Sequence, residues 1–93
     1  MNAKQKAAMR KIGCLACGKM PSDLAHIKSK KASGINADWN LIPLCREDHR
    51  LQHAMGWCWF LLRFPHIRKH LERIGWEFQE LKGRFLMFHK EDE

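Results

Sequence analysis

Nine residues, "CREDHRLQH" at 45–53, hold four side chains that can bind a metal ion: Cys45, Asp48, His49 and His53. Upstream, the segment "CLAC" at 14–17 adds a pair of cysteines, Cys14 and Cys17. A zinc ion in a protein usually has four ligands, so these candidates exceed the needs of one ion. The first question is therefore whether the chain binds one metal ion or two.

The length of the chain makes a stabilising metal plausible on physical grounds. A domain of 93 residues has a small hydrophobic core and often relies on a metal ion or on disulfides. A close cysteine pair followed by another cysteine among histidines favours metal binding. No stretch has the length and apolarity of a membrane span, and the N-terminus lacks the apolar segment of a signal peptide. We therefore expect a reducing cytoplasm and no membrane partner.

The hydrophobic pattern predicts an α+β fold. Glycines on both sides of "CLAC" permit the tight turn of a zinc knuckle. The short apolar runs "DLAHIK" and "NLIPLC" predict two strands joined by a polar loop, and a helix is expected from Arg46 through "EDHRLQHAMGWCWFLLRF". Pro65 fits the first turn of a second helix, "PHIRKHLERI". The segment "WEFQELKGRFLMF" predicts a C-terminal β-hairpin.

Apolar residues at helical spacing predict the buried face of the first of these helices. They are Leu51, Met55, Cys58, Trp59 and Leu62. We interpret the tryptophans at 57, 59 and 76 as core or interface residues. The histidines at 66, 70 and 89 are given no role.

Positive charge is concentrated in the first half of the chain. Residues 1–50 contain ten lysines and arginines against four acidic residues, whereas residues 51–93 contain seven against six. The basic half also contains all the metal-ligand candidates except His53, a combination that suits a polyanion such as nucleic acid. A lysine-rich surface that is merely solvated explains the charge equally well. The candidate phosphate-binding residues are Lys28, Lys30, Lys31, Arg46 and Arg50.

Three motifs occur in order: the cysteine pair, "AHI" with His26, and "NLIPLCREDHRLQH". Together they resemble the HNH nucleases, the zinc-supported branch of the ββα-metal endonucleases, and most closely the small phage and prophage type similar to Ref/NinG-like recombination nucleases. The resemblance covers about residues 12 to 60. It implies an HNH ββα-metal core with the zinc knuckle at 12–62, after a basic N-terminal arm at 1–11. Residues 63–93 would form a helix and hairpin that pack on this core.

The resemblance implies metal-dependent hydrolysis of DNA phosphodiester bonds. His26 would be the general base, since an imidazole can accept a proton near neutral pH. Asn40, at the start of the second strand, would hold the His26 loop in place. His49 and His53 would bind a catalytic divalent ion, for which a mainly imidazole site favours Zn, Ni, Co or Mn over Mg. One such unit cleaves one strand, so nicking and double-strand cleavage by a homodimer both stay open.

Two positions depart from the HNH pattern. Ala25 stands where many HNH enzymes have an Asp or His that binds the catalytic metal, so either the chemistry is lost or the helix supplies the ligands. Asp48 stands where the structural zinc often has a Cys or His. We expect Asp48 to complete the structural zinc site with Cys14, Cys17 and Cys45, but His49 is the rival fourth ligand.

Two other functions are alternatives to the nuclease. One is a non-catalytic, zinc-stabilised nucleic-acid-binding module, which Ala25 favours. The other is a protein-interaction domain that uses the aromatic surface at 57–60.

Overall fold

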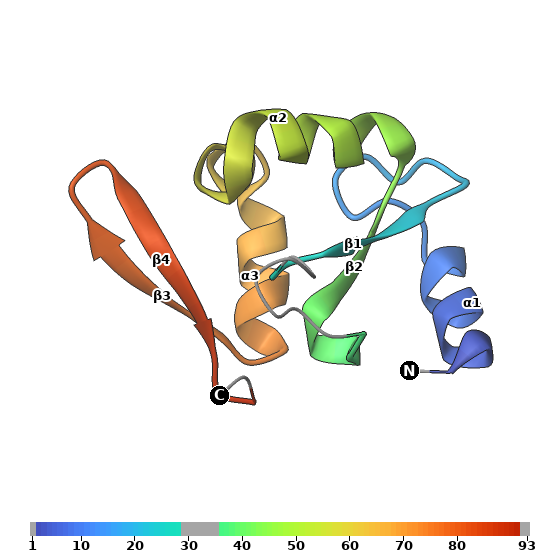
Figure 1. The fold of residues 1–93 in the computed structure, drawn as a ribbon. Coiled ribbons are helices and arrows are strands. Elements are labelled where there is room, and N and C mark those ends of the chain that lie inside the picture. Colours follow the sequence, from blue (N-terminus) through green and yellow to red (C-terminus); the bar gives the residue numbers. More distant parts are fainter. Residues whose placement is uncertain (1, 29–35, 92–93) are drawn as a thin grey trace. The chain divides into compact units, whose positions relative to one another are not determined.

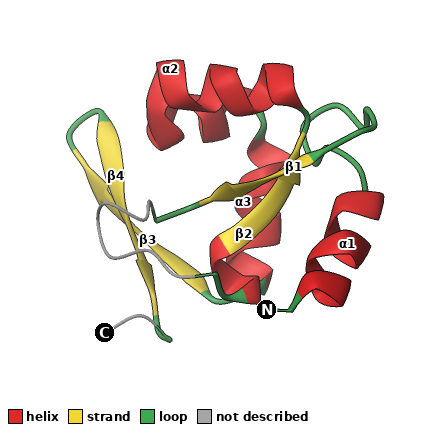
Figure 2. Cartoon of the chain, turned by 45° about the vertical axis from the view of Figure 1, so that its right-hand side comes forward, coloured by secondary structure: helices red, strands yellow, loops and turns green. Residues whose placement is uncertain are grey.

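A computed structural model of the chain describes residues 2–28 and 36–91 (Figure 1). Its elements are, in order, α1 (Ala3–Lys11), β1 (Asp23–His26), the 3-10 turn η2 (Asp38–Asn40), β2 (Leu41–Leu44), α2 (Arg46–Arg63), α3 (Pro65–Arg73), β3 (Trp76–Leu81) and β4 (Arg84–His89). The strands form two antiparallel sheets, β1–β2 and β3–β4, as Figure 2 shows. The predicted α+β class is confirmed.

The contacts divide the chain into two compact units, residues 1–54 and residues 55–93. The division falls within α2 and therefore inside the segment 12–62 that the sequence predicts as one core. Unit 1 contains α1, the β1–β2 sheet and the first half of α2. Unit 2 contains the second half of α2, α3 and the β3–β4 hairpin.

Unit 1 is built around a buried second strand. All four residues of β2 are buried, which matches the continuous apolar sequence "LIPL". Ala25 of β1 lies opposite Ile42, and His26 lies opposite Leu41. Cys45 follows β2 directly, and α2 begins at the next residue, so a strand–strand–helix order leads from His26 to His49 and His53.

The cysteine pair lies in a tight turn between α1 and β1. Gly13 and Gly18 have φ angles of +87° and +80°, so the glycines at both ends of the predicted knuckle adopt the backbone conformation that favours this residue. The Gly18 N–H donates to the Cys14 carbonyl at 2.8 Å, which closes the turn. The Leu15 N–H donates to the Pro43 carbonyl at 2.9 Å and attaches the knuckle to β2.

The helix α2 is interrupted at Gly56, which has the non-helical angles φ 79° and ψ 162°. The prediction of one continuous buried face is wrong beyond this point. Trp59 and Leu62 are 63% and 65% exposed, whereas Phe60 and Leu61 are 0% and 2% exposed. Residues share a helix face only while each one advances by about 100° around the axis. Because the helix is interrupted at Gly56, the residues after it do not continue the face formed by the residues before it.

Unit 2 contains the predicted second helix and hairpin. Pro65 occupies the first turn of α3, and Ile67 and Leu71 are buried as predicted. In the hairpin, Trp76 lies opposite His89. His89, to which the sequence assigned no role, is buried, and its Nε2–H donates to the Ile74 carbonyl at 2.7 Å. It is therefore a structural residue that links β4 to the end of α3.

Candidate functional site

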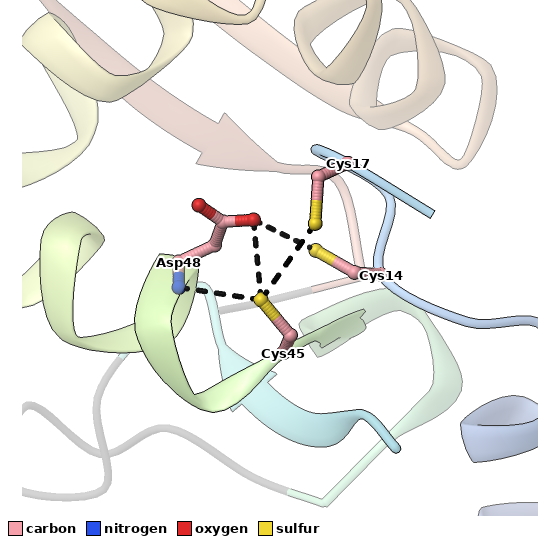
Figure 3. A group of neighbouring side chains, drawn as sticks. All are labelled: Cys14, Cys17, Cys45 and Asp48. Atoms are coloured by element: carbon pink, nitrogen blue, oxygen red, sulfur yellow. Dashed lines mark hydrogen bonds between the residues drawn. The ribbon is translucent and has the colours of Figure 1, made fainter. Parts of the chain in front are cut away.

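Cys14, Cys17, Cys45 and Asp48 form a compact cluster in unit 1 (Figure 3). The knuckle supplies the first two residues, Cys45 lies between β2 and α2, and the first turn of α2 supplies Asp48. One ligand atom from each residue lies within 4.8 Å of all the others. The cluster joins parts of the chain that are 28 and 34 residues apart.

The distances within this cluster suit a tetrahedral metal site. The Cys17 and Cys45 Sγ atoms are 3.8 Å apart, which is close to the edge of about 3.8 Å in a tetrahedron with metal–sulfur bonds of about 2.3 Å. An oxygen of Asp48, Oδ2, lies 3.1 Å from the Cys14 Sγ and 3.2 Å from the Cys45 Sγ. The four cysteines are free thiols. Three thiolates and one carboxylate form a donor set that zinc accepts.

The electrostatics of the cluster also favour a bound cation. A backbone hydrogen bond involving Lys19 lowers the pKa of the Cys17 thiol, but the Asp48 carboxylate, burial and the neighbouring thiols outweigh it and raise the pKa to about 12. Burial is the main cause that raises the pKa of Cys45. The thiols are therefore held in their neutral, protonated form beside the ionised Asp48, and a divalent ion would stabilise the thiolates as it displaces the thiol protons. Metal affinity is expected to rise with pH.

Of the two candidates for the fourth position, the structure brings Asp48 to the three cysteines. For Asp48, burial acts to raise the pKa, but hydrogen bonds from the Cys17, Cys14 and Cys45 thiols lower it, so the carboxylate is ionised. His49 is not part of this cluster, and its Nδ1 lies 3.8 Å from Asp23 Oδ2. The cluster is therefore complete without His49.

His26 lies in a separate pocket of about 310 Å³ between α1 and the strands. Lys6 and Arg10 of α1, Asp23 of β1 and Asn36 contribute to its wall. The Nε2 atom of His26 lies 2.7 Å from Asn36 Oδ1. An amide oxygen only accepts hydrogen bonds, so this contact places the imidazole proton on Nε2 and the lone pair on Nδ1.

Asn40 is fully buried, and its side chain holds the chain just beyond His26. Its Oδ1 accepts from the Lys28 N–H at 2.8 Å, and its Nδ2 donates to the Lys28 carbonyl at 3.0 Å. The Ile27 N–H also donates to the Asn40 carbonyl at 2.9 Å. These are contacts of the kind expected from the sequence, since they fix the backbone that follows the histidine.

His49 and His53 lie one turn apart on α2, with ring centroids separated by 4.9 Å. Burial is the main cause that lowers the pKa of His49, and the charge of His53 adds to this effect, whereas Asp23 opposes it. A neutral imidazole is the form that binds metals. In the part of the chain that the structure describes, this pair does not belong to a group of three gathered ligand atoms.

The basic residues named from the sequence are spread over unit 1. Lys28 is half-buried after β1, and Arg46 and Arg50 are exposed on α2. Lys30 and Lys31 lie outside the described residues.

Four further residues of this region were missed by the sequence reasoning: Lys6, Arg10, Asp23 and Asn36. Asp23 could have been found from the sequence, because it precedes Ala25 by two residues and side chains two apart in a strand lie on the same face. No sequence pattern pointed to Asn36 or to the two basic residues of α1, since only folding brings them to His26.

No family model matches this chain, and no curated protein or solved structure matches it either. Within the described residues, every helix is too short or too polar to cross a membrane.

Proposed function

We propose that this protein is a metal-dependent endonuclease of the HNH type that hydrolyses DNA phosphodiester bonds, with His26 as the general base. The observation that carries the proposal is the contact between His26 Nε2 and Asn36 Oδ1. It leaves Nδ1 as the proton acceptor, and a base needs such a fixed tautomer and orientation. The strand–strand–helix order and the histidine pair on α2 support the same function.

Water activated by His26 would attack the phosphorus in line with the departing 3′ oxygen. His49 and His53 are the residues that would hold the catalytic divalent ion, and Asp23, whose Oδ2 lies 3.8 Å from His49 Nδ1, would add the carboxylate that Ala25 cannot supply. Two imidazoles and a carboxylate suit Zn, Ni, Co or Mn. When bound, such an ion supplies positive charge against the charge that develops on the phosphate.

The cluster of three cysteines and Asp48 would hold a separate, structural zinc. It joins the knuckle, β2 and α2, and such a closed four-ligand site stabilises the fold of a small domain. The two metal sites would thus divide the ligands of residues 45–53. Cys45 and Asp48 turn to the knuckle, whereas His49 and His53 serve the catalytic ion.

Plasmid cleavage tests this proposal directly. The zinc-loaded protein is assayed with added Mn, Ni, Zn or Mg, and His26→Ala is expected to lose cleavage by a factor of about 100 or more. His66→Ala, which changes an exposed histidine of α3, is the control and is expected to cleave normally. Unchanged cleavage by His26→Ala would contradict the mechanism.

The alternative function is a non-catalytic, zinc-stabilised nucleic-acid-binding module. It is favoured by Ala25, which cannot bind a metal, and by the histidine pair not belonging to a three-ligand group in the described residues. Metal analysis separates the two functions. The module predicts one tightly bound zinc per chain, DNA binding and no cleavage, whereas the nuclease predicts a second, weaker ion whose binding is reduced by His53→Ala.

A further inference from the structure

The N-terminal helix α1 contributes to the same pocket as His26. Lys6 and Arg10 of α1 line that pocket together with Asp23, His26 and Asn36. We propose that Lys6 and Arg10 bind the phosphodiester backbone of a nucleic acid in this pocket, next to His26, so that α1 forms part of the substrate site. This inference rests on the nucleic-acid-binding part of the proposed function.

The composition of α1 is unusual for a packing helix. Its nine residues, "AKQKAAMRK", include four cations and no acidic residue, and none of its side chains is buried. Met9 is its only half-buried apolar side chain, so burial of apolar side chains contributes little to its position beside β1 and β2 (Figure 1). The charged side chains of this helix are all positive.

Hydrogen bonds close the first turn of α1 and link its last turn to the segment before β1. At its first turn, the Asn2 side chain accepts from the Gln5 N–H at 2.8 Å, and the Gln5 side chain accepts from the Asn2 N–H at 3.0 Å. Together they form a capping box. At its last turn, the hydroxyl of buried Ser22 donates to the Arg10 carbonyl at 2.7 Å. Ser22 directly precedes β1, so this bond holds the end of α1 next to the strand that bears His26.

Lys6 and Arg10 lie on one face of α1 because residues four apart in a helix are neighbours on its surface. Lys4 and Lys11 lie well away from that face, since each residue advances by about 100°. Within residues 2–28 and 36–91, Lys6 and Arg10 form no ion pair with an acidic side chain. Their charges are therefore available to an anion in the pocket.

Phosphate is the anion that best fits these groups. A guanidinium donates two parallel hydrogen bonds to phosphate oxygens, and an ammonium adds a point charge. Asp23 repels an anion at its side of the pocket and lies at ion-pair distance from His49. The phosphate is therefore expected on the α1 side, and a cation on the Asp23 side. A nucleic-acid strand offers the row of phosphates that such an arrangement needs.

The test compares two double variants of α1 with equal loss of charge. Lys6→Ala/Arg10→Ala removes the pocket cations, and Lys4→Ala/Lys11→Ala removes the cations of the other faces. Alanine is the best helix former, so both variants keep the helix, which circular dichroism checks. Binding of a short labelled DNA duplex is followed by fluorescence anisotropy at several salt concentrations, with one equivalent of zinc and no other divalent ion.

We expect Lys6→Ala/Arg10→Ala to raise the Kd by about tenfold or more at low salt and to reduce the slope of log K against log salt by about 2. Lys4→Ala/Lys11→Ala should raise the Kd by less than about threefold, since it removes only long-range attraction. The charge-conserving variant Lys6→Arg/Arg10→Lys should retain most of the affinity. Equal losses in the two alanine variants, or no loss in the pocket variant, would overturn the inference.

This test is independent of catalysis. If no metal supports cleavage by the wild-type protein while the pocket variant still loses DNA affinity, the nuclease proposal fails and the role of α1 stands. If His26→Ala abolishes cleavage while the pocket variant binds DNA normally, the nuclease proposal stands and the role of α1 is overturned.

Discussion

Two asparagines, one bonded to the His26 ring and one bonded to the backbone just beyond it, act through different contacts. Asn40 is fully buried and bonds both polar backbone groups of Lys28, whereas Asn36 is exposed and bonds the His26 ring. Asn40→Ala leaves the two Lys28 groups without these partners, and we expect it to reduce the free energy of unfolding by about 1–3 kcal/mol. Chemical denaturation of the zinc-loaded protein measures this loss.

Asn36→Ala is the matched change at the exposed position. Because the side chain is exposed, its effect on stability should be within about 0.5 kcal/mol. Under the proposed mechanism, it should lower the rate of plasmid cleavage, since the imidazole loses the contact that fixes its tautomer. A stability loss as large as that of Asn40→Ala would show that Asn36 is mainly structural.

Asp48 and Glu47 are adjacent acidic residues at the start of α2, but only Asp48 reaches the cysteines. We expect Asp48→Ala to weaken zinc binding more than the tenfold to about 100-fold loss that is typical of changes next to metal ligands. Glu47→Ala, at an exposed position, should leave zinc affinity nearly unchanged. Competition with a chromogenic chelator measures both, and similar affinities for the two variants would remove Asp48 from the ligand set.

The β3–β4 hairpin provides a test of an element in unit 2. Gly75 has a φ of +106°, and a Cβ there would lie 2.6 Å from His89 Nε2, the atom that bonds Ile74. Gly75→Ala should therefore lower the free energy of unfolding by about 2–4 kcal/mol. Gly83, at the tip of the hairpin, has a φ of +71°, and a Cβ there would meet no other atom within 4 Å. Gly83→Ala should therefore cost only about 1 kcal/mol.

Thermal or chemical unfolding of the two glycine variants gives this comparison. Equal losses would mean that backbone conformation alone matters at Gly75 and that the contact with His89 does not.

The elements also show where reasoning from sequence patterns holds. The strands β1 and β2, the helix α3 and the hairpin follow from local signals: short apolar runs, a proline in a first turn, and the Lys82–Gly83 turn. The face of α2 beyond Gly56 was predicted wrongly because a glycine in a helical pattern does not reveal whether the helix continues through it. At Gly56 it does not, and Phe60 and Leu61 are buried where Trp59 and Leu62 were expected.

At the scale of the whole molecule, the four candidate metal ligands Cys14, Cys17, Cys45 and Asp48 all lie in unit 1. Removing the metal with a strong chelator should therefore loosen the knuckle and the start of α2, while the β3–β4 hairpin keeps its hydrogen bonds. Hydrogen exchange measures this difference. The amides of Cys14, Gly18 and His49, which bond within the knuckle and α2, should lose protection, and those paired between β3 and β4 should retain it.

An equal rise in exchange across both units after chelation would show that the chain unfolds as one cooperative block. Retained protection of the knuckle amides would show that the cluster does not depend on a metal for its fold.

The sequence by itself determined the types of side chain and their local spacing. Local sequence was enough to predict three features, because each one involves only neighbouring residues. They are the glycines at 13 and 18 around the cysteine pair, the three-residue separation of Cys45 and Asp48, and the single helical turn from His49 to His53. Only the tertiary structure decided which of these groups meet. Asp48, and not His49, reaches Cys14 because the knuckle bonds to β2 through Leu15, and α1 carries Lys6 and Arg10 to His26 through Ser22. Contacts between distant segments depend on how the strands pair and how the helices pack on them, and local sequence patterns do not predict this.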